Sequence, residues 1–310
     1  MRAVMDRDTY AKNFAKRRDG ELAEQLRWVP RMYRAAASRL EKLERQAERQ
    51  FPGILNRLDQ ARDTAGDTIP AWCWLPVTHI QQVLADHYPH RGPRSPGATA
   101  PGLAALAAGG AARLQALGAW RAAGRHMVNI HDATVLELRK AVDHMPADLP
   151  QRWPLQGLYV VADAPNGALG SFLHLEWDER EQRAELRIAP DVAPTATLDQ
   201  IPVQPLHLEG GTVTEAARRT VLSLQAGFDK LLGTETLPDI SPGSAVDEAA
   251  RLVAQKNAFW VAAADWLASD RTAPFDAAVL AGAEPAAEWP PANAQDTGRA
   301  PVLWLAGPAS

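Results

Sequence analysis

The sequence lacks the features that would place it outside an ordinary reducing compartment. Its 310 residues contain one cysteine, Cys73, so no internal disulfide can form. No apolar run approaches the roughly 18 residues that a membrane span requires. Residues 1–19 have no apolar segment of the kind found in a secretory signal. We therefore expect a cytoplasmic protein without a membrane contact.

Signatures of common enzymes are also absent, since the chain has no glycine-rich phosphate loop and no G-x-S-x-G motif. Cys73 near His79 suggests a thiol hydrolase. Such an enzyme also needs an orienting group and a supported nucleophile, and the sequence shows neither. A cysteine between Trp72 and Trp74 is more typical of a small apolar core residue. We expect that the protein is not an enzyme.

The histidines do not form a recognisable metal site. His87 and His90 lie in a Pro/Gly-rich stretch, and His126 and His131 are five residues apart beside Asp132. Zinc sites usually combine cysteine and histidine at characteristic spacings, and a single cysteine cannot supply a C-x-x-C pair. We expect neither a metal nor another cofactor.

The carboxylates do not indicate a nuclease. Asp163, Glu176 and Asp178 are followed by arginines rather than by a lysine, and the last two run into a turn. Two-metal catalysis needs carboxylates that converge on one point. We interpret Glu176 and Asp178 as solvated charges of a hairpin.

The net charge of −4 is spread unevenly along the chain. Residues 1–66 hold 15 Lys/Arg against 10 Asp/Glu, whereas the other 244 residues hold 18 against 27. A basic front permits a weak contact with nucleic acid. This leaves an alternative function open, a nucleic-acid-associated regulatory protein of a mobile genetic element that uses its N-terminal helices.

The pattern along the chain predicts four regions. Residues 1–90 form a helical N-terminal region, with helices at 8–19, 30–50 and from 54 onward. Residues 91–102 form a Pro/Gly-rich linker. Residues 103–270 form an α+β core, and residues 271–310 form an Ala/Pro-rich tail with a terminal strand at 301–306.

Four capping-box patterns predict where helices begin. Thr78 with Gln81 starts a helix to about residue 87, and Thr134 with Glu137 starts one to about residue 144. The other two patterns are Thr212 with Glu215, for a helix to about 232, and Ser244 with Asp247, for a helix to about 269. A further helix is expected at 103–125.

Alternating residues predict a small, mainly antiparallel sheet flanked by helices. Strands are expected at 158–162, 172–177 and 184–188, and the last two form a hairpin. His174, Glu176 and Arg187 belong to its polar face, which is typically solvated. A strand at 201–208 would lie at a sheet edge because it contains Pro202 and Pro205.

Ten tryptophans are many for this length. Tryptophan suits both cores and peptide-binding grooves, because it joins a large apolar ring to one polar donor. Trp177, Trp260 and Trp266 lie on faces that the pattern predicts to be buried. A polar hairpin beside an edge strand can also dock an extended peptide.

Several short motifs share their order and spacing with a known family. They are found at residues 102–106 (GLAAL), 118–121 (GAWR), 138–149 (LRKAVDHMPADL), 158–160 (LYV), 170–177 (GSFLHLEW), 204–205 (QP), 211–217 (GTVTEAA) and 258–266 (AFWVAAADW). Over about residues 100–270 the chain resembles the second described family of type V-A anti-CRISPR proteins. The N-terminal helices match poorly, and the C-terminal stretch differs from the family's basic, His/Trp/Gly-rich end.

The resemblance implies an α+β protein encoded by a phage or plasmid that acts in a bacterial cytoplasm. It implies binding of the N-terminal peptide of the type V-A effector nuclease while that chain is being made, followed by loss of its mRNA. The peptide-binding candidates are Trp120, Arg121, Tyr159, His174, Glu176, Trp177, Arg187, Gln204 and Trp260.

Overall fold

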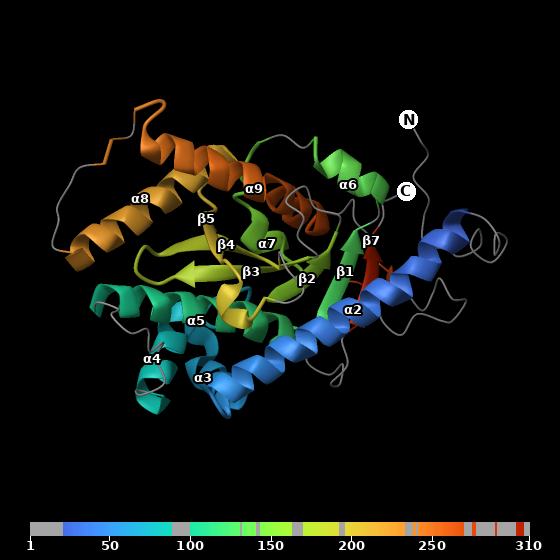
Figure 1. The fold of residues 1–310 in the computed structure, drawn as a ribbon, viewed down its shortest axis with the longest axis horizontal. Coiled ribbons are helices and arrows are strands. Elements are labelled where there is room, and N and C mark those ends of the chain that lie inside the picture. Colours follow the sequence, from blue (N-terminus) through green and yellow to red (C-terminus); the bar gives the residue numbers. More distant parts are fainter. Residues whose placement is uncertain are drawn as a thin grey trace.

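The computed structural model describes residues 21–88, 100–130, 132–140, 143–162, 170–191, 196–232, 238–239, 241–269, 275–276, 289 and 302–306. These residues form an α+β fold in which helices cover both faces of one sheet (Figure 1). The helix predicted at 8–19 and most of the predicted linker lie outside the described ranges.

The sheet has seven strands in the order β5-β4-β3-β2-β1-β7-β6. The strands are β1 (His126–Ile130), β2 (Gly157–Val161), β3 (Ser171–Asp178), β4 (Arg183–Pro190), β5 (Gln204–His207), β6 (Phe275–Asp276) and β7 (Val302–Ala306). Strand β1 runs parallel to β2 and β7, and the other four pairings are antiparallel. The mainly antiparallel sheet and the terminal strand are therefore confirmed.

Helices form a layer on each side of the sheet. The helices are α2 (Glu21–Gln50), α3 (Ile54–Ala65), α4 (Val77–His87), α5 (Ala100–Ala122), α6 (Asp132–Leu138), α7 (Leu149–Arg152), α8 (Val213–Leu232) and α9 (Ala245–Leu267), with short 3₁₀ helices η1 (Gly66–Thr68) and η2 (Leu198–Gln200). Figure 1 shows α8 and α9 on one face, and α5 with α3 and α4 on the other. No helix within the described ranges is both long and apolar enough to cross a membrane.

Alternation along the strands builds a separate apolar core on each face. On β3, Leu173 and Leu175 belong to the core that includes Trp260 of α9. Phe172, which precedes Leu173 and points to the other face, belongs to the core that includes Trp120 of α5. The second core also contains buried side chains of α2 and α3, and the predicted division into four regions stays a prediction.

Helix α5 packs close enough to its neighbours to require glycine at two contacts. A Cβ added to Gly118 would lie 2.0 Å from the ring of Trp74, which is buried. A Cβ added to Gly157 of β2 would lie 2.7 Å from the backbone of Ala119. Close backbone approach of this kind explains why glycine occupies both positions.

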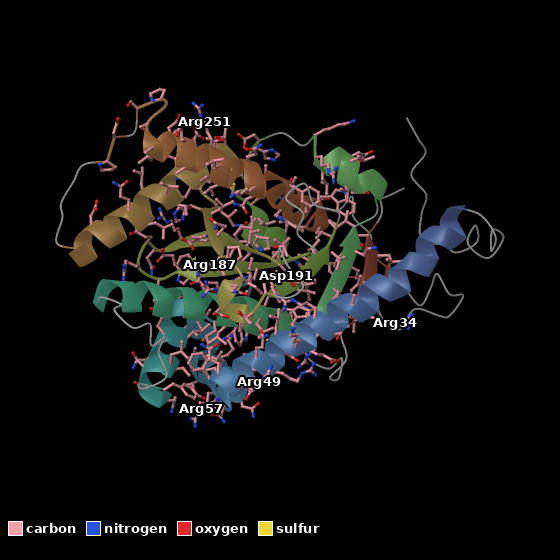
Figure 2. The ribbon with its side chains drawn as sticks, in the orientation of Figure 1. Arg34, Arg49, Arg57, Arg187, Asp191 and Arg251 are labelled. Carbon is pink, nitrogen blue, oxygen red and sulfur yellow. The ribbon has the colours of Figure 1, made fainter. Side chains whose placement is uncertain are left out.

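Ion pairs join the N-terminal helices to the rest of the fold. Arg39 of α2 donates from Nε and Nη2 to Asp191, at 2.8 Å each, just after β4. Arg125 pairs with Glu44 of α2, and Arg121 of α5 pairs with Asp59 of α3. Figure 2 shows Asp191 inside the fold, whereas Arg49 and Arg57 lie at its outer rim.

Two of the four predicted helix starts are confirmed. Glu215 N donates to Thr212 Oγ1 at 3.1 Å, and Thr212 N donates to Glu215 Oε2 at 2.7 Å, which is a complete capping box before α8. Ser244 Oγ accepts from Asp247 N at 3.2 Å and caps α9.

The other two predicted helix starts are wrong. Helix α4 begins at Val77 after Pro76, which has no capping side chain, and Thr78 instead donates to Glu179. Helix α6 begins at Asp132, before Thr134, and ends at Leu138 rather than near residue 144. The pattern at α4 fails because a contact from another element, the Glu176 carboxylate on β3, satisfies the first backbone N–H of the helix.

Two further differences concern the start of helix α2 and a strand that the sequence prediction missed. The helix predicted at 30–50 begins at Glu21, so its backbone continues through Pro30 despite the hydrogen bond that a proline removes. The sequence prediction missed β1, whose five residues lie between the helix predicted at 103–125 and the helix predicted to begin at Thr134. Strand β1 is enclosed by β2 and β7, and a short buried parallel strand has no alternation by which to recognise it.

Candidate functional site

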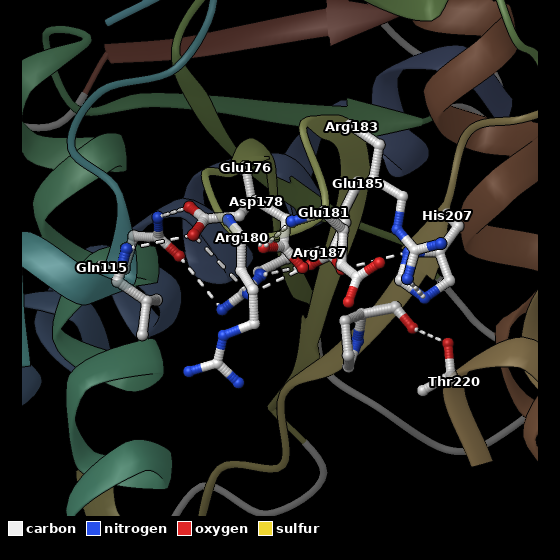
Figure 3. A network of polar contacts seen from close by, with 12 residues as sticks. Gln115, Glu176, Asp178, Arg180, Glu181, Arg183, Glu185, Arg187, His207 and Thr220 are labelled. Carbon is white, nitrogen blue, oxygen red and sulfur yellow. Dashed lines mark hydrogen bonds and ion pairs between the residues drawn. The ribbon is translucent and has the colours of Figure 1, made fainter. Parts of the chain in front are cut away.

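Three of the predicted peptide-binding residues come together between α5 and the sheet. His174 and Glu176 of β3 and Arg187 of β4 share one face, and His174 pairs directly with Arg187 in the strand register. The prediction that this face is solvated is wrong. His174 and Glu176 are buried, because α5 lies over this part of the hairpin (Figure 3).

Gln115 of α5 connects these three side chains, and the sequence prediction did not include it. Its Oε1 lies 3.1 Å from His174 Nε2, and its Nε2 donates to Leu75 O at 2.8 Å and also to Glu176 Oε2. Arg187 Nη1 donates to the same Oε1 at 3.5 Å. One amide thus satisfies a donor and an acceptor on the sheet at once.

Glu176 also supplies the cap that α4 lacks in its own sequence. Its Oε1 accepts from the backbone N of Val77, the first residue of α4, at 3.0 Å. The first N–H groups of a helix have no partner within the helix, and an acidic group there is favoured by the helix dipole. Glu176 therefore ties α4 to β3.

The polar cluster continues along β4 and β5 toward the sheet edge. Arg187 donates to Glu185 Oε2 from Nη2 at 3.0 Å, and Glu185 Oε1 lies 3.1 Å from His207 Nδ1. Arg183 Nη2 lies 3.1 Å from His207 Nε2, and Arg183 also pairs with Glu209. If Arg183 donates to Nε2, a neutral His207 carries its proton on Nδ1, toward Glu185.

Burial sets the protonation of this cluster. It raises the pKa of Glu176 to about 7, although the charge of Arg187 and the Val77 N–H act in the other direction. It lowers the pKa of His174 to about 3, so this ring is neutral. Burial also acts to raise the pKa of Glu185, but the contact with His207 and the charge of Arg187 outweigh it and bring that pKa to about 2.

Cys73 adjoins the cluster but is not poised as a nucleophile. It is buried and forms an isolated bridge with Leu175 of β3. Burial, with the charge of Glu176, raises its pKa far above the ordinary value, which opposes formation of the reactive thiolate. His79, the partner considered from the sequence, instead lies 3.1 Å from Glu179.

Three predicted residues are core residues. Trp120 and Tyr159 lie in the core beneath α5, and the Trp120 Nε1 donates to the carbonyl of His126 at 3.1 Å. Trp260 lies in the other core, on the opposite face of the sheet. The structure therefore does not bring these three side chains to one surface.

The remaining three predicted residues are partly exposed but lie apart. Arg121 pairs with Asp59 at 2.6 Å. Trp177, near the end of β3, makes an edge-to-face contact with the partly exposed Trp72, with ring centroids 6.1 Å apart. Gln204 is on the edge strand β5. Of these, Trp177 offers an aromatic surface to a partner.

The edge strand is less open to an added strand than the sequence suggested. The Pro205 carbonyl accepts a hydrogen bond from Thr220 Oγ1 of α8 at 2.6 Å. Thr220 is labelled in Figure 3, with a dashed line at its hydroxyl group. A proline has no N–H to donate. Pro205 therefore offers neither backbone group to a peptide strand at this edge.

The described side chains contain no group of three or more His, Cys, Asp or Glu that could hold a metal ion. His126, one of the histidines considered from the sequence, has its Nδ1 occupied by a hydrogen bond from Trp304 Nε1 at 2.8 Å. Burial lowers the pKa of this ring to about 4. His131, its predicted neighbour, lies outside the described residues, as does His90. The expectation that the protein needs no cofactor stays a prediction.

The geometry favours organisation of the fold over chemistry on a small molecule. Glu176, His174 and Arg187 lie close together between α5 and the sheet. Most of their polar atoms form hydrogen bonds with Gln115, Glu185 and Val77. Binding to a partner would fall to side chains at the surface, and Trp177 with Trp72 is the aromatic pair that the sequence prediction partly anticipated.

No family model and no curated protein matches this chain. Among solved structures, its fold is similar to the crystal structure of AcrVA2, with a TM-score of 0.53. The similarity covers 88% of this chain and 84% of that chain, at 14% sequence identity. Likeness at so low an identity establishes a shared architecture and leaves function to be argued separately.

Proposed function

We propose that this protein is an anti-CRISPR protein of the type V-A kind, acting by binding rather than by catalysis. The observation that carries the proposal is the fold similarity to AcrVA2, which extends over most of both chains. A similarity confined to the sheet would be less informative, because common sheets host many functions.

The motifs that resemble the second described family fit this fold for physical reasons. Gly118, in the motif at 118–121, is where a Cβ would clash with Trp74. Gly170, which opens the motif at 170–177, is where a Cβ would lie 2.7 Å from the ring of Tyr159. Both glycines permit close packing, so these motifs support a shared fold more than a shared binding surface.

In the finer proposal, the protein binds the N-terminal peptide of the type V-A effector nuclease as that chain is made. Binding then leads to loss of the effector mRNA in a bacterial cytoplasm, and the gene resides on a phage or plasmid. The family resemblance supports each of these steps. The partly exposed Trp72–Trp177 pair supports peptide contact, because aromatic side chains are frequent anchors in interfaces.

A direct binding measurement tests the proposal. The full chain is titrated with a synthetic peptide of the effector's N-terminal segment, using isothermal titration calorimetry, and a scrambled peptide of the same composition is the control. We expect binding to the native peptide alone. The absence of heat at about 100 µM peptide, where even weak specific complexes form, would rule out this target.

A variant pair then locates the contact. We expect Trp177→Ala to weaken peptide binding by about tenfold or more, as loss of an aromatic anchor does. Trp266→Ala is the matched control, because Trp266 is also partly buried but lies on α9 and packs against a different core from Trp177. Equal effects of both substitutions would exclude a peptide contact at Trp177.

A further inference from the structure

Two buried carboxylates beneath α5 share one arginine. Glu176 and Glu185 are each 3% exposed, and Arg187 is the cation between them. Its Nη2 lies 3.0 Å from Glu185 but 3.7 Å from Glu176. An ionised Glu176 thus carries the less compensated charge, and a buried charge of this kind is costly unless the group takes up a proton.

Within the described ranges, the other groups that face Glu176 do not supply a second cation. On β3 itself His174 is neutral, since burial lowers its pKa to about 3. The segment before α4 contributes the thiol of Cys73, which is also neutral because burial and Glu176 raise its pKa. Helix α5 contributes the uncharged amide of Gln115, and α4 contributes its N-terminus through Val77 N, with His79 paired to Glu179 on its first turn.

Glu176 is also a point at which α4 is attached to the sheet, beside the contacts of Thr78 and His79 with Glu179. Its two oxygens accept from Val77 N of α4 and from Gln115 Nε2 of α5. The ionised carboxylate is the stronger acceptor for both donors, whereas the protonated form avoids the cost of a buried charge. Ionisation of Glu176 therefore strengthens its two hydrogen bonds and at the same time adds the cost of a buried charge.

We propose that Glu176 is a proton-linked contact, so that gain or loss of a proton on its buried carboxyl group changes how firmly α4 and the adjoining N-terminal helices are held on the sheet. The inference goes beyond peptide binding and does not depend on the proposed function.

The sign of the effect follows from linkage. Burial raises the pKa of Glu176 from its ordinary value of 4.5 to about 7, so the folded protein holds a proton that the unfolded chain releases between these values. Glu176 therefore stabilises the fold less as pH rises from 4.5 to 7. His126 and His174 act in the opposite direction, because their pKa values are lowered to about 4 and about 3. The contribution of Glu176 must therefore be read as a difference between variants.

The test compares three full-length proteins by urea unfolding between pH 5 and 8: the wild type, Glu176→Gln and Glu179→Gln. Glu179 is the matched control, because it also contacts the first turn of α4 but is 38% exposed. From pH 5 to 8 we expect the unfolding constant of the wild type to rise at least tenfold more than that of Glu176→Gln. Glu179→Gln should follow the wild type.

Hydrogen exchange reports on α4 itself. After correction for intrinsic rates, the protection of amides 77–80 should fall with rising pH more steeply in the wild type than in Glu176→Gln. The same pH dependence in both proteins would overturn the proposal. If Glu176→Gln does not fold, the carboxyl carbon of Glu176 can be titrated by NMR in the wild type. A midpoint near 7 supports the proposal, and a midpoint near 4.5 refutes it.

Discussion

The two faces of the sheet are built from the same strands but are held to their helices by different interactions. Toward α8 and α9, strands β3 and β4 present Leu173, Leu175, Leu186 and Ile188, all buried in an apolar core. Toward α5, the same two strands present the polar cluster of Figure 3 along with apolar residues such as Phe172.

The difference has a physical consequence for how each helix layer is positioned. Apolar contacts are non-directional, so the α8–α9 layer depends on the area and fit of the buried surface. Buried polar groups each require a partner at a defined distance. We infer that the polar cluster restricts α4 and α5 to one position on the sheet, whereas the apolar face mainly supplies stability.

The largest expected effect comes from breaking the polar face. Arg187→Met leaves Glu176 and Glu185 without their shared cation, and we expect a loss of about 3–5 kcal/mol in the free energy of unfolding. Arg45→Met is the control, since Arg45 pairs with Glu41 in an exposed pair on α2 and should cost about 0.5 kcal/mol or less. Urea unfolding measures both. Similar losses for the two variants would contradict a special role for the buried cluster.

The apolar face is tested by removing one core side chain. Leu173→Ala should cost about 2–4 kcal/mol, because a fully buried leucine leaves a cavity. Unlike Glu176→Gln, it should leave the pH dependence of stability unchanged. Leu252→Ala on α9 is the control, since Leu252 is 56% exposed and should change stability by less than about 0.5 kcal/mol. A pH-dependent effect of Leu173→Ala would contradict the inference that, of these two faces, only the polar one makes stability depend on pH.

The closeness of α5 to its neighbours is tested with two glycines of that helix. Gly118→Ala should cost about 1–3 kcal/mol, because the added methyl group meets the ring of Trp74. Gly110→Ala has no atom within 4 Å of the added Cβ and should stabilise the helix by about 0.5–1 kcal/mol. Thermal unfolding separates the two outcomes by sign. A stabilising Gly118→Ala would show that α5 is not tightly seated.

The smallest expected effect distinguishes a local helix cap from a distant one. Thr212→Ala removes the capping side chain of α8 and should cost about 1 kcal/mol. Thr78→Ala should cost less than about 0.5 kcal/mol, because Thr78 is exposed and Glu176 caps α4. Equal losses in urea unfolding would indicate that Thr78 caps α4 after all.

These helix starts also show what the sequence could and could not predict. Thr212 and Ser244 were identified correctly because each bonds to a backbone N–H three residues away. Thr78 was misassigned because the acceptor for Val77 N is Glu176, which is 99 residues away in the chain. A local pattern cannot contain a contact of that separation.

The candidate site was predicted in the same partial way. Alternation correctly placed His174 and Glu176 on one face of the hairpin, but it could not say that α5 covers that face. Gln115 was missed, although one amide in the otherwise apolar stretch LQALGAW was a usable signal. His207 was missed because its partner Glu185 is on another strand.

The most direct test of the proposed function follows effector production in bacterial cells that express this protein. Two altered effector genes are compared with the wild type: one has synonymous codons over its N-terminal segment, and the other has the same segment with changed amino acids. If the nascent peptide is recognised, effector protein and mRNA should fall with the wild-type and synonymous genes but not with the changed peptide. Unchanged levels with all three genes, or loss that follows the codons instead of the peptide, would contradict the proposal.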